Sequence, residues 1–168
     1  MSFTARGFAE SWMPGAEPGE GLQRAWLLGR CGIVRITGAE VLRVSGTVAV
    51  AALAVLEASG TLLGPILANR ARSTAEFVVA AGTGATWPAL PGANCVEDAV
   101  MRCPAPEFTA ASRRHAGGRT CICAPGPGRP ATTDSDVLCE AVTTPLVTLE
   151  SPWLAFARAT CSGGARLT

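Results

Sequence analysis

The side chains with the most specific chemistry in this chain are thiols and one imidazole. The sequence holds seven cysteines and a single histidine. Three of the cysteines fall on two short apolar segments that predict strands, and the histidine lies in the loop between them: Cys103, Cys121, Cys123 and His115. Ligands of these types can bind Zn²⁺ tetrahedrally, so the set is a candidate metal site.

The spacing of these residues speaks against zinc. Alternation along a strand predicts that Cys121 and Cys123 share one face, with Cys103 on the neighbouring strand. Cys139 would lie on the helix that follows. Zinc modules use C-x2-4-C turns, which this arrangement lacks, and small buried thiols packing in a core explain the same residues. We therefore expect no metal and no cofactor, with the zinc site kept as the alternative.

Arginine is concentrated in the segment 101–130, where the only acidic residue is Glu107. Arg113, Arg114 and Arg119 could form a patch that contacts phosphate groups. No aromatic residue is interleaved with them to stack on bases, as proteins that bind single strands prefer. A solvated basic loop therefore explains the three arginines as well as a nucleic-acid contact does.

Catalysis by side chains finds little support. His115 is the only histidine, and no serine lies in a G-x-S-x-G elbow. Asp134 and Asp136 resemble a carboxylate pair, but their place in the first turn of an expected helix predicts capping. We name no catalytic residue.

Length and composition indicate one folded domain. Of the 168 residues, 48% are hydrophobic and 16% are charged, and the formal net charge is +1. The chain is too apolar to be disordered, and its overall charge is too small to attract nucleic acid or an anionic membrane. We expect a flexible arm over 1–21, a domain over 22–150 and a C-terminal tail over 151–168.

The stretch 72–87 predicts the strand around which the domain is built. Its residues are apolar on nearly both sides, which is typical of a strand in the middle of a covered sheet. Helices are predicted over 48–58, ended by Gly60, and from the threonines at 132–133 to Pro145. These elements predict an α+β fold, in which a small mixed or antiparallel sheet has two main helices packed on it.

Two other segments bear on fold and location. The segment 25–37 has two short apolar runs, which predict a hairpin, or an extended approach followed by a strand over 33–37. The segment 48–68 is nearly uncharged, but Glu57 and several breaks favour a buried helix over a transmembrane one. The first fifteen residues lack the apolar core of a signal peptide. We expect a cytoplasmic protein with reduced thiols and no membrane contact.

Several stretches carry a resemblance to a known family. They are AWLLGRCGIVRIT (25–37), LGPILANRARSTAEFVVAAGT (63–83), WPALPG (87–92), MRCPAPE (101–107), GGRTCICAPG (117–126) and TTDSDVLCEAV (132–142). In these loose patterns, which cover most of residues 25–142, the chain resembles small actinobacterial proteins related to the N-terminal domain of bifunctional DNA primase/polymerases. The resemblance implies an α+β fold and a nucleic-acid or nucleotide ligand.

The chain departs from this family at its catalytic centre. In catalytic members the strand that matches 32–37 ends in an Asp-x-Asp pair that holds divalent ions. Arg35 and Thr37 stand there instead, and an arginine repels Mg²⁺. Glu40 is close in sequence, but one carboxylate in an expected turn does not rebuild a two-metal site. Where the family presents a histidine to phosphate, this chain offers 74–76, so polymerase chemistry is not expected.

Three functions remain open at this stage. The first is a non-catalytic binding or accessory module that contacts nucleic acid or nucleotide through Arg113, Arg114 and Arg119. The second is a nucleotidyltransferase with unrecognised catalytic carboxylates. The third is a protein-interaction subunit whose apolar segment 48–68 packs on a partner.

Overall fold

The computed structural model describes residues 16–126 and 128–150. The strands are β1 (Ala16–Pro18), β2 (Gly32–Ile36), β3 (Ala39–Ser45), β4 (Ile66–Asn69), β5 (Thr74–Ala80), β6 (Ala93–Glu97), β7 (Val100–Cys103) and β8 (Arg119–Cys123). The helices are α2 (Leu22–Leu27), α3 (Gly46–Ser59), the short 3-10 helix η1 (Arg70–Arg72), α4 (Thr83–Thr86) and α5 (Ser135–Glu150).

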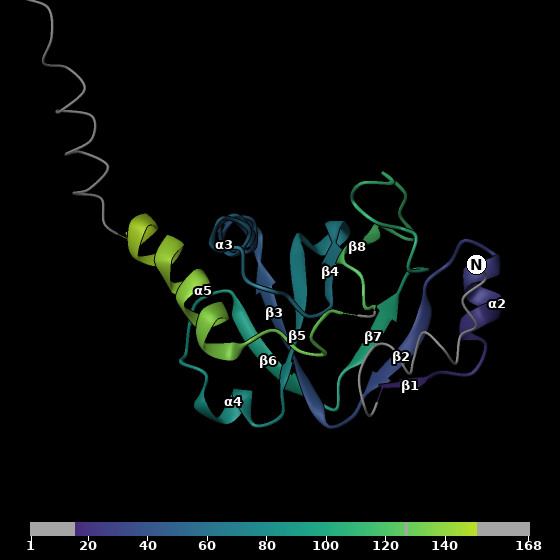
Figure 1. The fold of residues 1–168 in the computed structure, drawn as a ribbon, viewed down its shortest axis with the longest axis horizontal. Coiled ribbons are helices and arrows are strands. Elements are labelled where there is room, and N and C mark those ends of the chain that lie inside the picture. Colours follow the sequence, from purple (N-terminus) through teal and green to yellow (C-terminus); the bar gives the residue numbers. More distant parts are fainter. Residues whose placement is uncertain (1–15, 127, 151–168) are drawn as a thin grey trace, which may run out of the picture.

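The described strands form two sheets. One has five strands in the order β6-β3-β5-β4-β8, and the other has three in the order β1-β2-β7. Every pair within the two sheets is antiparallel. Figure 1 shows α3 and α5 on one side of the five-stranded sheet and the three-stranded sheet on its other side. The predicted α+β fold, with an antiparallel sheet and two main helices packed on it, is confirmed.

Strand β5 lies at the centre of the five-stranded sheet, as its sequence predicts. Ala75, Phe77 and Val79 belong to a core beneath α3 and α5. Val78 belongs to a second core, between the two sheets. Each core removes the apolar side chains of one face from water, and this burial is the main favourable term in folding.

The two long helices begin and end largely as their sequences predict. Gly60 ends α3 in the left-handed conformation, with φ of 66°. Asp134 caps α5, because its Oδ1 accepts hydrogen bonds from the backbone N–H groups of Asp136 and Val137 at 2.9 and 3.1 Å. The capping role inferred for this aspartate is thereby confirmed.

Helix α5 does not stop at Pro145 as predicted, but continues to Glu150. Proline removes one intrahelical hydrogen bond and normally ends or kinks a helix. Pro145 is buried, and Leu146 packs against the core beneath the helices. Burial of these side chains offsets the missing bond, and the sequence signal for a stop is overridden.

The segment before β2 is helical and does not form a hairpin. Leu22 and Trp26 are one helical turn apart, and both pack against the core between the sheets. The strand expected over 33–37 is observed as β2. Residues 16–18, assigned in the sequence to a flexible arm, form β1 and pair with β2; the rest of the arm up to residue 15 and the tail over 151–168 lie outside the described residues.

Helix α3 ends at Ser59, well short of Ala68. Over the part of the chain that the structure describes, no helix is both long enough and apolar enough to cross a membrane.

Candidate functional site

The cysteines do not gather into one site. Cys121 lies in the core between the sheets, whereas Cys123 lies in the core beneath the helices. The cause is a bulge: Leu67 of β4 pairs with Cys121 and Ile66 with Cys123, so that Ile122 is an extra residue in β8. The prediction that the two cysteines share one strand face is therefore wrong.

The remaining members of the proposed zinc set also lie apart. Cys103 is buried between the sheets, His115 is exposed in its loop, and Cys139 is half-buried on α5. Among residues 16–126 and 128–150, no group of three or more His, Cys, Asp or Glu side chains is arranged to hold a metal ion. Burial raises the pKa of Cys103 well above its usual value and that of Cys121 to about 12. Both are neutral thiols near neutral pH and weak nucleophiles.

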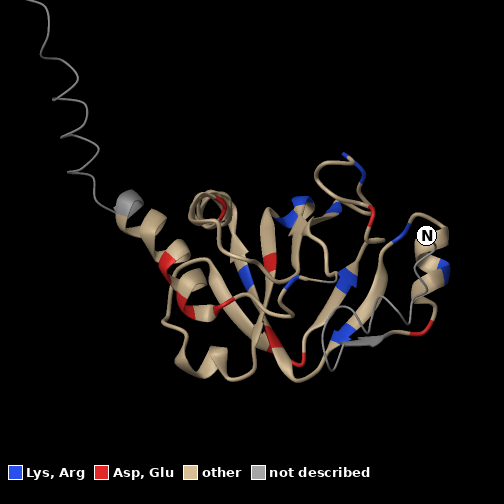
Figure 2. Cartoon of the chain, in the orientation of Figure 1, with Lys and Arg blue, Asp and Glu red and all other residues tan. Residues whose placement is uncertain are grey.

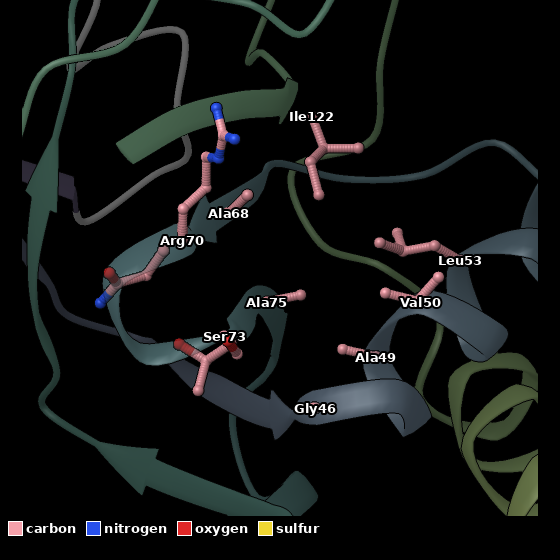
Figure 3. A pocket seen from close by; sticks show the side chains of 11 residues that line it. Gly46, Ala49, Val50, Leu53, Ala68, Arg70, Ser73, Ala75 and Ile122 are labelled. Atoms are coloured by element: carbon pink, nitrogen blue, oxygen red, sulfur yellow. The ribbon is translucent and has the colours of Figure 1, made fainter. Parts of the chain in front are cut away.

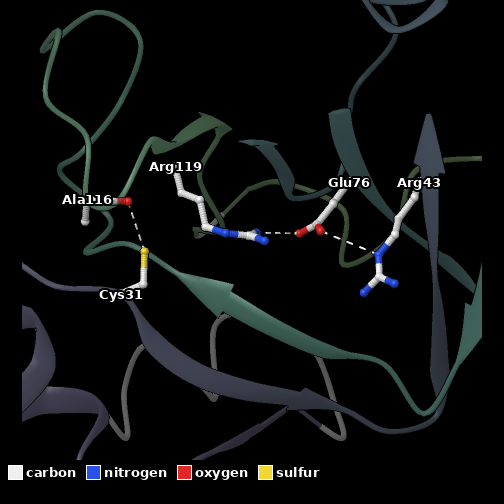
Figure 4. Close-up of polar contacts among 5 residues, drawn as sticks. All are labelled: Cys31, Arg43, Glu76, Ala116 and Arg119. Carbon is white, nitrogen blue, oxygen red and sulfur yellow. Dashed lines mark hydrogen bonds and ion pairs between the residues drawn. The ribbon is translucent and has the colours of Figure 1, made fainter. Parts of the chain in front are cut away.

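Arg119 is used inside the protein. Its Nη1 donates a hydrogen bond to Glu76 Oε2 at 2.9 Å, and Arg43 Nε lies 3.5 Å from the other carboxylate oxygen (Figure 4). The side chains of Glu76 and Arg119 are 5% and 13% exposed. The structure thus places Arg119 in a buried ion pair between the sheets, away from the exposed Arg113 and Arg114.

The loop that precedes β8 presents Arg113 and Arg114 to solvent. Ser112 Oγ accepts a hydrogen bond from the N–H of Thr109 at 3.0 Å and donates one to its carbonyl at 2.9 Å, which closes a tight turn. Arg113 follows with φ of 55°, a left-handed conformation that is unusual for a large side chain. The Arg114 guanidinium lies 4.2 Å from the centre of the Phe108 ring and is held by it.

Arg70 joins this loop from a different part of the chain. It opens η1, directly after β4, and its backbone N–H donates a hydrogen bond to the Gly118 carbonyl at 2.9 Å. The bond ties η1 to the loop. Arg70, Arg113 and His115 therefore line one cavity of about 410 Å³, whose floor includes Thr120. We call it the basic cavity.

The sequence analysis did not single out Arg70. The signal was present, since Arg70 and Arg72 flank the turn between two apolar strands. Nothing in the sequence, however, says that this turn contacts the loop at 104–118. In Figure 2 basic residues occur in η1, in that loop and on the three-stranded sheet, whereas α5 carries acidic ones.

A second, mainly apolar cavity of about 360 Å³ adjoins the basic cavity. The two have Ala68, Arg70 and Ile122 in common. In Figure 3, Val50 and Leu53 of α3 extend toward Ile122 of β8 across this space. We call the second cavity the apolar trough and the pair the groove.

Glu40 lies within β3 and not in a turn as expected. Its Oε1 accepts a hydrogen bond from the Gly82 N–H at 2.6 Å, and its Oε2 accepts bonds from the Gly84 N–H at 2.6 Å and the Cys95 thiol at 3.0 Å. Desolvation opposes the charge, but these bonds outweigh it and lower the pKa of Glu40. The carboxylate thus fixes the turn that leads into α4.

The positions that replace the family's acid pair carry no such cluster. Arg35 is exposed on β2, and Thr37 follows the end of that strand. Comparison with protein-family models, with curated protein sequences and with solved structures finds no match for this chain. The candidate site is therefore defined by geometry: a groove between α3 and the loop before β8, with arginines at one end.

Proposed function

We propose that this chain is a non-catalytic, primase/polymerase-like binding module that contacts phosphate groups of nucleic acid or nucleotide at the basic cavity. The observation that carries the proposal is the convergence of Arg70, Arg113 and His115 on one cavity of about 410 Å³. Guanidinium groups suit phosphate because they offer several donors in a planar fork. Arg114 lies beside Arg113 in the same exposed loop.

Two further features support a binding role without catalysis. Glu40, the carboxylate nearest in sequence to the positions that match the family's acids, is bound by two backbone amides and a thiol. The six cysteines among the described residues are free, which agrees with the reducing cytoplasm we propose as the location.

Binding of a fluorescent single-stranded oligonucleotide, followed by anisotropy over a range of salt concentrations, tests the proposal. We expect Arg113→Glu with Arg114→Glu to weaken binding by at least tenfold and to reduce the salt slope by about 2, one for each lost phosphate contact. The control is Arg24→Glu with Arg35→Glu, which makes the same change in net charge on α2 and β2. Equal losses in the two double variants would refute a site at the basic cavity.

A labelled nucleoside triphosphate in the same assay separates the two ligand classes. If the nucleotide binds and the oligonucleotide does not, the module is specific for the nucleotide. If neither binds to the wild-type chain at low salt, the proposal is wrong.

A further inference from the structure

The apolar trough is a feature that contact with phosphate alone leaves unused. Val50 on α3 is 70% exposed and Ile122 on β8 is 37% exposed, so two large apolar side chains of facing walls are open to water. Figure 3 shows both of them, with Leu53, turned toward the same space. Apolar surface held open in this way is typical of a binding site.

Small side chains on the floor create the trough. The residues that leave this space between the helix and the sheet are Gly46, Ala49, Ala68 and Ala75. The resulting volume of about 360 Å³ lies within the range of small-molecule sites. The lining contains no aromatic side chain, so the trough suits an aliphatic group better than a stacked base.

The trough opens onto a cationic end. Arg70 lines both cavities, and Arg113 and His115 line the basic one. Among the described residues that line the two cavities there is no aspartate or glutamate. A ligand with an aliphatic body and an anionic head therefore matches the groove in shape and in charge.

We propose that the groove binds a single-chain alkyl phosphate, a phosphate monoester of a long-chain alcohol. Its phosphate lies between Arg70 and Arg113, and its chain lies between α3 and Ile122. This inference rests on the proposed contact of Arg70 and Arg113 with phosphate. It adds the second half of the ligand, and the occupant is a monomeric amphiphile and not a membrane surface.

The length of the trough sets the length of the chain. Its wall on α3 runs from Gly46 to Leu53, which is about 10 Å along a helix axis. With carbon–carbon bonds of about 1.5 Å, an extended zigzag chain of about eight carbons covers that distance. Affinity is expected to rise with chain length up to octyl phosphate and then to level off.

Calorimetric titration with butyl, hexyl, octyl and dodecyl phosphate, each below its micelle concentration, tests this expectation. A buried methylene tightens binding about three- to fourfold, so octyl phosphate is expected to bind about a hundredfold more tightly than butyl phosphate. Octyltrimethylammonium, which has the same chain with a cationic head, is expected to bind at least tenfold more weakly than octyl phosphate.

Two variants locate the chain. Val50→Glu puts a carboxylate into the trough and is expected to cost at least tenfold in octyl phosphate affinity. Val147→Glu is the matched control, because Val147 is an exposed valine, 59% accessible, on the other long helix. Val50→Trp fills the trough without adding charge and is expected to weaken octyl phosphate more than butyl phosphate. Binding that ignores both Val50 variants overturns the inference.

The outcomes separate this inference from the proposed function. If a nucleotide or butyl phosphate binds at the basic cavity but affinity does not depend on chain length, the inference is wrong and the proposed function stands. If neither nucleic acid nor nucleotide binds while octyl phosphate does, the inference stands and the proposed ligand class is wrong. Binding only to anionic phospholipid vesicles, without binding of monomeric octyl phosphate, overturns the inference.

Discussion

The Arg119 guanidinium lies 2.9 Å from the Glu76 carboxylate, although the two residues belong to β8 and β5 and strand β4 runs between them. The pair therefore bridges three strands of the five-stranded sheet on the face that looks toward the three-stranded sheet. Arg43 approaches Glu76 from β3 on the opposite side, at 3.5 Å. This buried group connects four adjacent strands, and it explains why an arginine from a basic segment does not serve the surface.

Loss of the Arg119 side chain is expected to destabilise the fold. Arg119→Ala leaves Glu76 buried, with only the longer contact to Arg43. Removal of one partner of a buried ion pair is costly because the other charge stays in a poorly solvated place. We expect a loss of roughly 2–4 kcal/mol in the free energy of unfolding, measured with urea.

Arg114→Ala serves as the matched control, because Arg114 is an exposed arginine of the same segment and is expected to leave the urea midpoint nearly unchanged. The double variant Glu76→Leu with Arg119→Met is expected to regain part of the lost stability, since no unpaired buried carboxylate remains. Equal effects of Arg119→Ala and Arg114→Ala would contradict the structural role.

Glu40 should make stability depend on pH in the acidic range. Its pKa in the folded chain lies below the ordinary value of 4.5 because hydrogen bonds from Cys95, Gly84 and Gly82 outweigh desolvation. A lowered carboxylate pKa contributes stability that is fully present above the unfolded pKa and is lost as the pH falls through the folded pKa. Glu40→Gln is expected to cost about 2–3 kcal/mol at pH 7, since a charged acceptor of several bonds is lost.

The test is the difference in unfolding free energy between wild type and Glu40→Gln at several pH values. We expect this difference to be constant from pH 7 down to about 4.5 and to shrink below it. Glu57→Gln, at an exposed glutamate of α3, provides the comparison. A difference that stays constant into strong acid would mean that Glu40 is not ionised in the folded chain.

Cys95 offers a chemical readout of the same contact. Desolvation, the hydrogen bond to Glu40 and its negative charge raise the pKa of the Cys95 thiol to about 12. Alkylation proceeds through the thiolate, so Cys95 should react slowly with iodoacetamide at pH 8. Glu40→Gln removes the negative charge and is expected to speed alkylation of Cys95 several-fold, as followed by mass spectrometry of its peptide. An unchanged rate at Cys95 would show that the carboxylate does not control this thiol.

The central strand and the two long helices could be predicted because each has a local signal. The apolar run at 74–80, the left-handed glycine at Gly60 and the aspartate cap at Asp134 depend on a few neighbouring residues. The helix over Pro145 was missed because its continuation depends on burial against α3 and the sheet, which no local pattern reports.

The candidate site was predicted only in part for a similar reason. Arg113 and Arg114 stand out in the sequence as a basic loop, and the structure presents both to solvent. The separation of Cys121 from Cys123 follows from one extra residue in β8, which depends on pairing with β4. Arg70 reaches the site through a hydrogen bond to Gly118, and such long-range contacts are set by tertiary packing.

A close approach between Gly64 and the start of α5 provides the last prediction. The Gly64 N–H donates a hydrogen bond to Thr133 Oγ1 at 3.1 Å, and the Thr133 N–H donates one to the Val78 carbonyl at 2.8 Å. A Cβ on Gly64 would lie 2.6 Å from the Thr132 carbonyl carbon and 2.7 Å from the Thr133 nitrogen. Backbone atoms that are held in place by hydrogen bonds cannot yield cheaply, so Gly64→Ala must displace the segment that leads into α5.

We expect Gly64→Ala to lower stability by about 3 kcal/mol, which corresponds to a fall in Tm of roughly 6–10 °C for a chain of this size. Gly126→Ala is the control, since a Cβ there would meet nothing within 4 Å, and its Tm should change by no more than about 2 °C. Thermal unfolding followed by circular dichroism measures both. Equal Tm values for Gly64→Ala and wild type would show that the lead into α5 is not packed against residue 64, and the helix layer would then be held by the contacts of α5 with α3 and the sheet alone.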